Sequence, residues 1–446
     1  NIIPKKYKLS ELNKIFIKHS NYKFVNFIND IKLRNNKDGL RLEDALIYRF
    51  MYSDPNSTKE SITSHINYVY ETTFDRQTFD SKENNIGIDV YLSIFEDIFK
   101  LVSTPTINLL HDPVNTLDIK NHVMVGIDGT YNLDYEFKQQ MNLCMYDITN
   151  SIPIYLTNNS KNTEIKSVTD LIKGNLDLLK NSKYIFIFDR GYHSKDFFNF
   201  LNNNGLLFII RCKNNCKQNL FSKDKFRFVN KDTISVSTFF TPKKEKSCYK
   251  VTTKNKVCLV TNIKADLSDE FLLNMYANRW EIEIFFKLLK ANFKFSNMHQ
   301  HNPISDKKTY ICNLIIILIT TYLKNMMMDI KKITSVKNIN TTNLIRGFFS
   351  ENLIEEFINE KFRESNVLNF CDSYIKITKN KKNRHFLRIS KRPFSKWYVK
   401  KFSLNSSYLK IIKAHIKRDP SDLHANEKVK YNKIIKIDII DKKQFG

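Results

Sequence analysis

The sequence predicts an α/β domain with a mixed sheet, flanked by helical regions at both ends of the chain. Three apolar runs alternate with helical segments between residues 123 and 210, and a strand hairpin follows the first run, which is typical of a mixed sheet. Apolar residues recur at helical spacing before residue 118, and the part after residue 330 is rich in lysine and mostly helical. The predicted parts are therefore 1–118, 119–330 and 331–446.

Several helices are predicted in the first part. Leu42 to Met51 is apolar at helical spacing, and Ser57 to Glu60 has the form of a capping box that opens a helix ending near Tyr70. Asp75 is expected to cap a further short helix that carries Arg76, Gln77 and Lys82. Two short helices joined by a tight turn have the outline of a helix-turn-helix, which binds DNA in some proteins and has no such role in many others.

The central part contains the predicted sheet. Its strands are expected at Val123–Ile127, Gln140–Tyr146, Ile152–Leu156, Tyr184–Phe188 and Leu206–Ile210, and its helices at Thr163–Leu179 and Lys195–Leu201. A polar insertion of about residues 211–256 has β character at Thr233–Phe240 and is closed by a strand at Val257–Thr261. A long helix is predicted from Ser268 through Phe293.

A second apolar helix is predicted from Tyr310 to Leu323. This run is shorter than the roughly 20 residues that span a bilayer, so a buried helix is favoured and no membrane partner is expected.

The charge balance indicates a polyanionic partner. There are 72 Lys and Arg residues against 46 Asp and Glu residues, a net charge of +26. Such an excess is tolerated when nucleic acid or an anionic surface binds the protein, although the abundance of Asn, Lys and Ile also fits an AT-rich gene. The run from Lys376 to Lys401 has basic and aromatic but no acidic residues, as in a surface that follows a nucleic-acid backbone or in a solvated basic face.

The seven cysteines form no paired framework, which fits a reducing compartment. Cys212, Cys216, Cys248 and Cys258 lie in one stretch, but their spacing matches no familiar zinc pattern, so a zinc site is disfavoured.

Two apolar strands of the predicted sheet end in an aspartate. Asp128 follows Val125 to Ile127, and Asp189 follows Tyr184 to Phe188. Functional side chains collect at the carboxyl ends of strands, and a buried carboxylate needs a partner or a metal ion. Either residue alone could be a turn cap. If the two strands are neighbours, the pair can share divalent metal ions.

The long predicted helix carries a third acidic candidate. At about 100° per residue, five side chains fall within an arc of about 80° on one face: Tyr276, Arg279, Glu283, Lys287 and Lys290. Glu281 points about 160° away from Glu283 by the same geometry. An exposed i, i+4 pair would explain Glu283 and Lys287 but leaves the other three unexplained.

These residues resemble the Tyr-Arg-Glu-Lys signature of the insertion-sequence-four family of DDE transposases. Two residues separate Tyr276 from Arg279, three separate Arg279 from Glu283, and six separate Glu283 from Lys290. The resemblance extends over Asn121 to Phe293, in the blocks Gly126–Thr130, Phe188–Tyr192, Leu207–Arg211 and Leu259–Asn262.

The resemblance implies a ribonuclease-H-like catalytic core in which Asp128, Asp189 and Glu283 bind two Mg²⁺ or Mn²⁺ ions. It also implies excision of a transposon at its inverted repeats, through a DNA hairpin intermediate, and insertion elsewhere. The residues implied to contact DNA are Tyr276, Arg279, Lys287, Lys290 and Arg190. Arg190 fits a phosphate contact or a salt-bridge partner equally.

The implied partners are double-stranded DNA, as transposon ends and target, and a second copy of the chain. The expected location is the cytoplasm of a prokaryote or the nucleus of a eukaryote. Two other readings stay open: a domesticated DNA-binding protein without catalysis, and a nuclease of the same fold that does not join DNA.

Overall fold

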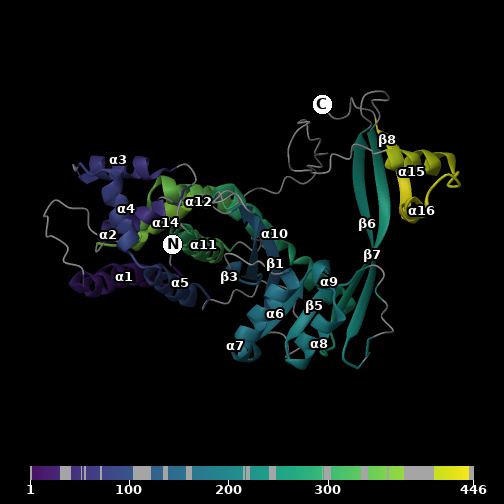
Figure 1. The fold of residues 1–446 in the computed structure, drawn as a ribbon, viewed down its shortest axis with the longest axis horizontal. Helices are drawn as coiled ribbons and strands as arrows, with labels where there is room; N and C mark the ends of the chain where they lie inside the picture. The colour runs from purple at the N-terminus through teal and green to yellow at the C-terminus, as the bar shows by residue number, and fades with distance from the viewer. Residues whose placement is uncertain are drawn as a thin grey trace. The chain divides into compact units, whose positions relative to one another are not determined.

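The computed structural model of the chain divides into two compact units (Figure 1). Unit 1 comprises Asn1–Ile210 and Asn262–Asn380, and unit 2 comprises Arg211–Thr261 and Lys381–Gly446. The structure describes residues 3–30, 42–51, 53–54, 57–70, 73–103, 122–133, 139–156, 163–213, 216, 221–222, 224–240, 248–293, 295, 303–332, 340–358, 361–375 and 406–440. The basic run from Lys376 to Lys401 lies outside the described residues.

Five strands of unit 1 form a mixed sheet in the order β3-β2-β1-β4-β5. They are β1 (Val123–Leu133), β2 (Gln139–Asp147), β3 (Ile152–Leu156), β4 (Tyr184–Phe188) and β5 (Leu207–Arg211). The first three are antiparallel neighbours, whereas β1, β4 and β5 run parallel. Three antiparallel strands followed by two parallel strands, in this order, are typical of a ribonuclease-H-like fold. The predicted fold class is therefore confirmed.

Helices cover both faces of this sheet, and two glycines of β1 show how closely. A Cβ on Gly126 would lie 3.7 Å from Cβ of Ile282, in α10 (Trp280–Asn292), whereas a Cβ on Gly129 would lie 3.0 Å from Cδ of Glu164, in α6 (Glu164–Gly174). Side chains alternate along a strand, so α10 and α6 lie on opposite faces of β1. Asp128 is two residues after Gly126 in β1, so its side chain lies on the same face of the strand and faces α10.

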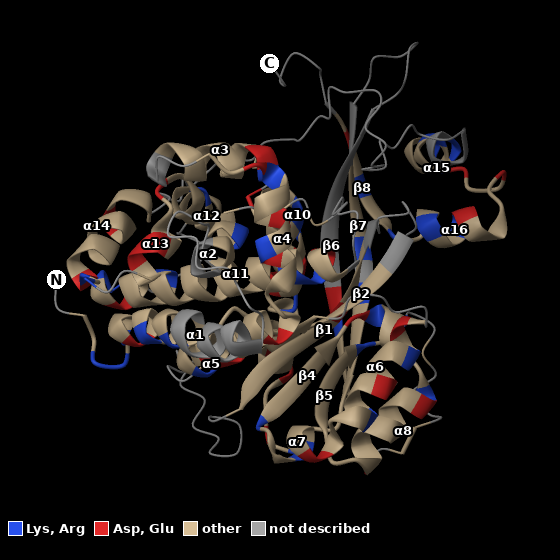
Figure 2. Ribbon diagram, turned by 60° about the vertical axis from the view of Figure 1, so that its left-hand side comes forward, with Lys and Arg blue, Asp and Glu red and all other residues tan. Residues whose placement is uncertain are grey.

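Further helices connect the parallel strands. They are α7 (Leu176–Asn181), the short 3₁₀ turn η1 (Arg190–Tyr192) and α8 (Lys195–Asn203). The single helix predicted over Thr163–Leu179 is wrong in one respect: it breaks at Asn175, whose backbone leaves the helical region at φ −127° and ψ 23°. Both acidic and basic residues occur along α6 and α8 (Figure 2).

The first part of the chain is helical where described, as predicted. Its helices are α1 (Leu9–Asp30), α2 (Leu42–Met51), α3 (Lys59–Tyr70), α4 (Arg76–Asn85) and α5 (Ile88–Ser103). Asp75 caps α4 through Thr78 N–H, as expected. The capping box of α3 lies one residue later than predicted, because Thr58 and Ser61 exchange backbone-to-side-chain bonds at 2.9 and 3.1 Å while Ser57 bonds to Asp54.

The central element of the helical region is α11 (Pro303–Ile330), which packs against α5 and α2 (Figure 1). It is long and apolar enough to cross a membrane by length and composition, but its most apolar window is 100% buried inside the protein. A core helix passes the same test, and the burial agrees with the predicted buried helix. Around it lie α12 (Thr341–Ser350), α13 (Leu353–Ile358) and α14 (Glu364–Tyr374).

In the described residues of unit 2, an antiparallel sheet is accompanied by two helices. Strand β7 (Cys248–Thr261) pairs with β6 (Arg227–Phe240) on one side and β8 (Ile434–Ile440) on the other. The helices α15 (Ser406–Lys417) and α16 (Ala425–Tyr431) belong to the same unit, and Ile411 and Ile412 of α15 share a small core with Val251. The strand character of the insertion is confirmed, whereas β8 departs from the helical prediction for the last part of the chain.

The cysteines of unit 2 lie close to one another. Cys212 N–H donates to Cys258 C=O at 2.8 Å, and the sulfur atoms of Cys212 and Cys216 lie within 4.8 Å of one another. The side chain of Cys248 lies outside the described residues.

Candidate active site

Asp128 and Asp189 occupy matching positions on neighbouring parallel strands. Ile127 of β1 is in register with Phe188 of β4, and each aspartate is the next residue. Asp128 lies within β1, opposite Cys144 of β2, because this strand continues to Leu133 instead of ending at the aspartate as predicted. Asp189 directly follows β4 and accepts a hydrogen bond from Gly191 N–H at the start of η1. The sheet therefore brings the two predicted aspartates together at one edge.

A single arginine connects Asp128 to the third acidic candidate. Arg279 donates from Nη1 to Oδ2 of Asp128 at 3.2 Å and from Nη2 to Oε1 of Glu283 at 2.5 Å. The three side chains are partly buried, with 12% of Arg279, 18% of Asp128 and 29% of Glu283 exposed. Charge-assisted bonds of this kind are strong, so the guanidinium holds the two carboxylates beside each other.

The helix that supplies Arg279 and Glu283 is not continuous, contrary to the prediction for Ser268–Phe293. It divides into α9 (Asp269–Ala277) and α10, and the bonds across the join are of the tighter i, i+3 kind, such as Arg279 N–H to Tyr276 C=O at 3.0 Å. Arg279 is the residue directly before α10, where its side chain reaches both carboxylates. The uniform arc predicted for this face therefore holds only from Arg279 onward.

The acidic side chains repel one another at this edge of the sheet. Burial, together with the negative charges of Glu164 and Asp189, raises the pKa of Asp128 to about 7, although Arg279 opposes the shift. A carboxyl group in this state gains from a nearby cation. Carboxylate oxygens are also the ligands that Mg²⁺ prefers, so the donor set fits a divalent metal ion.

Glu164 is a fourth carboxylate here, and the sequence interpretation missed it. Its Oε1 accepts a hydrogen bond from Gly129 N–H at 2.9 Å, next to Asp128. A glutamate in the first turn of a helix is ordinarily explained by the helix dipole, so its position in the sequence gave no signal. We refer to Asp128, Glu164, Asp189 and Glu283 as the acidic cluster.

The remaining predicted DNA-contacting residues surround Glu283 and Asp189 in different ways. Lys287 is exposed, with Nζ 4.8 Å from the ring centroid of Trp280. Lys290 is half-buried, and burial lowers its pKa. Tyr276 is close enough to Arg279 to contribute to its electrostatics, and Arg190 is exposed beside Asp189. Neither Arg190 nor Lys290 has a salt bridge within the described part of the chain.

Three other carboxylates, Glu281, Asp147 and Asp134, are close in sequence to the predicted site residues. Glu281 lines a cavity of about 290 Å³ with Lys324, whose pKa burial lowers to about 8. Asp147 is buried and accepts bonds from Asn150 N–H at 2.8 Å and Asn150 Nδ2 at 2.7 Å, which is a turn-capping arrangement. Asp134 lies outside the described residues.

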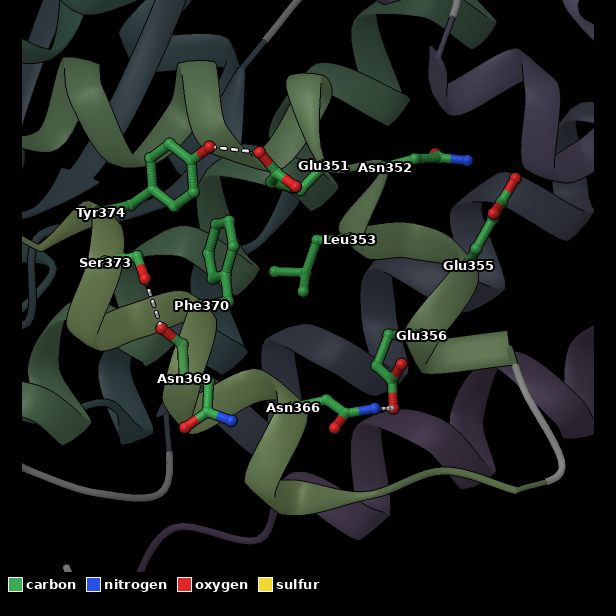
Figure 3. A pocket seen from close by; sticks show the side chains of 10 residues that line it. All are labelled: Glu351, Asn352, Leu353, Glu355, Glu356, Asn366, Asn369, Phe370, Ser373 and Tyr374. Carbon is green, nitrogen blue, oxygen red and sulfur yellow. Dashed lines mark hydrogen bonds between the residues drawn. The ribbon is translucent and has the colours of Figure 1, made fainter.

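A larger cavity of about 760 Å³ lies elsewhere in unit 1 and contains none of the predicted site residues (Figure 3). It is formed around α13 and α14, where Asn366 Nδ2 donates to Glu356 Oε1 at 3.1 Å and the Tyr374 hydroxyl donates to Glu351. Its acidic side chains are thus held by neighbouring polar groups. The chemistry of the acidic cluster makes that cluster the better candidate for an active site.

Comparisons with known proteins find a family-model match over part of the chain. No curated protein matches the chain. Among solved structures it is similar to a piggyBac transposase, in a synaptic complex with hairpin DNA determined by cryo-electron microscopy, at 10% identity and a TM-score of 0.39, over 84% of each chain. The family model for the transposase DDE domain matches residues 136–318, a range that contains Asp189 and Glu283 and begins after Asp128. Over that range the chain is similar to the DDE domain of transposases.

Proposed function

We propose that this protein is a DNA transposase that cleaves and joins DNA at transposon ends by cut-and-paste phosphoryl transfer, with Asp128, Asp189 and Glu283 as its catalytic carboxylates. The observation that carries the proposal is the convergence of these three side chains. Asp128 and Asp189 each follow one residue of the in-register pair Ile127 and Phe188, and Glu283 is joined to Asp128 through Arg279. The match of residues 136–318 to a transposase DDE domain supports the same reaction class.

Two divalent ions, Mg²⁺ or Mn²⁺, are the proposed cofactors, with Asp128 shared between them and Asp189 and Glu283 each holding one. Bound there, they would supply activation of the attacking water or 3′-hydroxyl and stabilisation of the leaving oxygen. The raised pKa of Asp128 supports this, because a second positive charge relieves the repulsion that Arg279 alone leaves in place.

The chain's own cations are proposed to hold the DNA backbone. Arg279 would exchange a carboxylate for a phosphate oxygen, since its planar guanidinium matches either group. Lys290 lies on the same helix as Glu283, and this half-buried side chain would contact a phosphate near the cleaved end. Tyr276 and Lys287 would contact adjacent phosphates, and Arg190 would do so beside Asp189.

Other parts of the chain are proposed to contribute DNA recognition and assembly. The consecutive helices α3 and α4 retain the outline of a helix-turn-helix, and Asn67 bonds to both backbone groups of Phe74 at 2.8 Å, which fixes the turn between them. Joining two transposon ends would require a homodimer. The reaction would take place in the cytoplasm of a prokaryotic host or the nucleus of a eukaryotic one.

Cleavage of DNA that carries the element's own ends tests the proposal. The substrate is the DNA flanking the gene, where short inverted repeats identify the ends. We expect strand cleavage with Mg²⁺ or Mn²⁺ and none with EDTA, and we expect Asp128→Ala to lower the rate on the order of 10³-fold while DNA binding is retained. Absence of metal-dependent cleavage by the wild-type chain would sink the proposal and favour a protein that only binds DNA.

Strand joining separates a transposase from a nuclease of the same fold. A pre-cleaved end with a free 3′-hydroxyl is incubated with a second duplex. The proposal predicts covalent joining that is lost in Asp189→Ala, whereas a nuclease cleaves the ends without joining them.

A further inference from the structure

One carboxylate oxygen connects the two segments that carry Asp128 and Asp189. Oε1 of Glu164 accepts the N–H of Gly129 at 2.9 Å and the hydroxyl of Tyr192 at 2.5 Å. Gly129 directly follows Asp128, and Tyr192 lies three residues after Asp189. A single side chain from α6 is therefore tied both to β1, next to Asp128, and to η1, which follows β4 and Asp189.

Glu164 approaches β1 closely at a glycine. A Cβ on Gly129 would lie 3.0 Å from Cδ and 3.1 Å from Oε1 of Glu164, which is closer than ordinary contacts allow. Glu164 comes from the face of the sheet opposite α10. It therefore contacts the backbone beside Asp128 from one face of the sheet, whereas Arg279 and Glu283 lie on the other face.

The other end of the connection is equally fixed. Tyr192 is fully buried, and its ring centroid lies 5.0 Å from that of Phe188 and 6.0 Å from that of Phe197. Phe188 is the last residue of β4. Since aromatic packing immobilises the ring, the hydroxyl presents a donor to Glu164 at a set distance from the end of β4.

The arrangement carries an electrostatic cost. Gly129 N–H also donates to Oδ1 of Asp128 at 2.9 Å, so two carboxylates share one donor. Glu164 forms no salt bridge with any described residue. A second carboxylate next to Asp128, with hydrogen bonds but no cation of its own among the described residues, is unfavourable unless it has a compensating role.

We propose that Glu164 is a positioning residue that sets the separation of Asp128 and Asp189 through Gly129 and Tyr192, so that the two carboxylates bind divalent metal ions together. This inference rests on the proposed function. Groups behind the metal ligands orient those ligands, and their loss typically lowers metal affinity by about 10- to 100-fold.

Four variants of the full chain test it. Glu164→Ala removes the acceptor, and Tyr192→Phe removes only the hydroxyl. Glu164→Gln keeps a carbonyl oxygen that can accept both bonds, so it should restore the connection. Asp170→Ala removes an exposed carboxylate from the same helix and is the matched control.

The measurement is Mn²⁺ binding, followed by the electron paramagnetic resonance signal of free Mn²⁺, with thermal unfolding alongside. We expect Glu164→Ala and Tyr192→Phe each to weaken Mn²⁺ binding by about tenfold or more. A fifth variant that combines these two substitutions should bind Mn²⁺ no more weakly than Glu164→Ala, because both substitutions remove the same connection. Glu164→Gln and Asp170→Ala should bind as the wild type does.

Two results would overturn the inference. One is unchanged Mn²⁺ affinity in Glu164→Ala, whatever its melting temperature. The other is a loss in Glu164→Gln equal to that in Glu164→Ala, which would show that the charge and not the connection matters. Wild-type Mn²⁺ affinity in Asp128→Ala and Asp189→Ala would instead contradict the proposed function, so the two failures are distinguishable.

Discussion

Two groups of charged side chains in unit 1 are built in opposite ways. The first joins Arg49, Glu83 and Lys308, all at most 2% exposed, with Glu83 Oε1 3.6 Å from Arg49 Nε and 3.5 Å from Lys308 Nζ. The second is the acidic cluster, in which Arg279 contacts two of four carboxylates, and its members are partly exposed. The first group has more cations than anions, and the second has the reverse.

The difference separates a structural ion group from a site for a ligand. The cations of the first group also donate to protein oxygens, as Lys308 Nζ does to Glu83 C=O at 2.8 Å and Arg49 Nη2 does to Ser305 C=O at 2.5 Å. It is closed to solvent. The acidic cluster has excess negative charge and is partly exposed, and burial of Asp128 together with this charge raises the pKa of Asp128. Only the second group gains from an added cation.

The largest loss of stability is expected from a substitution in the group of Arg49, Glu83 and Lys308. Glu83→Ala leaves Arg49 and Lys308 buried without their anion, and removal of one partner from such a group costs about 3–5 kcal/mol. Urea denaturation should show this loss in the free energy of unfolding, with no difference between Mg²⁺ and EDTA. A loss below about 1 kcal/mol would mean that solvent reaches these residues and that the comparison is wrong.

A smaller effect is expected for the cation of the acidic cluster. Arg279→Ala removes charged hydrogen bonds to Asp128 and Glu283 and should cost about 2 kcal/mol in EDTA. Mg²⁺ should recover most of this loss, because a bound ion replaces the missing positive charge and stabilises the folded state. An equal loss in Mg²⁺ and in EDTA would indicate that Arg279 is structural in the same sense as Arg49.

The smallest effect is a gain in stability. The pKa of Asp128 is about 7 in the folded protein and about 4 when unfolded, so the folded state binds more protons between these values and loses stability as pH rises from 4 to 7. Asp128→Asn should therefore stabilise the metal-free protein by about 1 kcal/mol above pH 7 and not at pH 4, since the weaker bond to Arg279 offsets part of the gain. Thermal melts at pH 4 and pH 8 in EDTA check this. Destabilisation at pH 8 would mean that Arg279 already compensates Asp128 fully.

Local patterns predicted much of the fold and the positions that the acidic candidates occupy. Asp128 and Asp189 were identified because each follows an apolar run. The two residues meet because these runs form the neighbouring parallel strands β1 and β4. Helical spacing distinguished Glu283 from Glu281, and this needs no knowledge of distant residues. The assignment of these residues to catalysis stays a prediction.

Features that depend on contacts between distant segments could not be predicted. Glu164 meets Gly129 across 35 residues and Tyr192 across 28, and its own surroundings in the sequence resemble an ordinary helix start. The join between α9 and α10 places no proline or glycine at Asn278 or Arg279 to announce it. Strand β8 pairs with β7 from the far end of the chain, and alternation alone did not separate it from a helix.

A comparison of two glutamates that lie two residues apart on α10 tests the assignment of Glu283 as a catalytic carboxylate. Glu283→Gln and Glu281→Gln each remove one negative charge with nearly unchanged shape, and they are compared in Mn²⁺-dependent cleavage of the element's own ends. We expect Glu283→Gln to lower the cleavage rate on the order of 10³-fold with DNA binding retained, and Glu281→Gln to cleave at close to the wild-type rate. Equal activity in the two variants, or a loss in Glu281→Gln alone, would contradict the assignment.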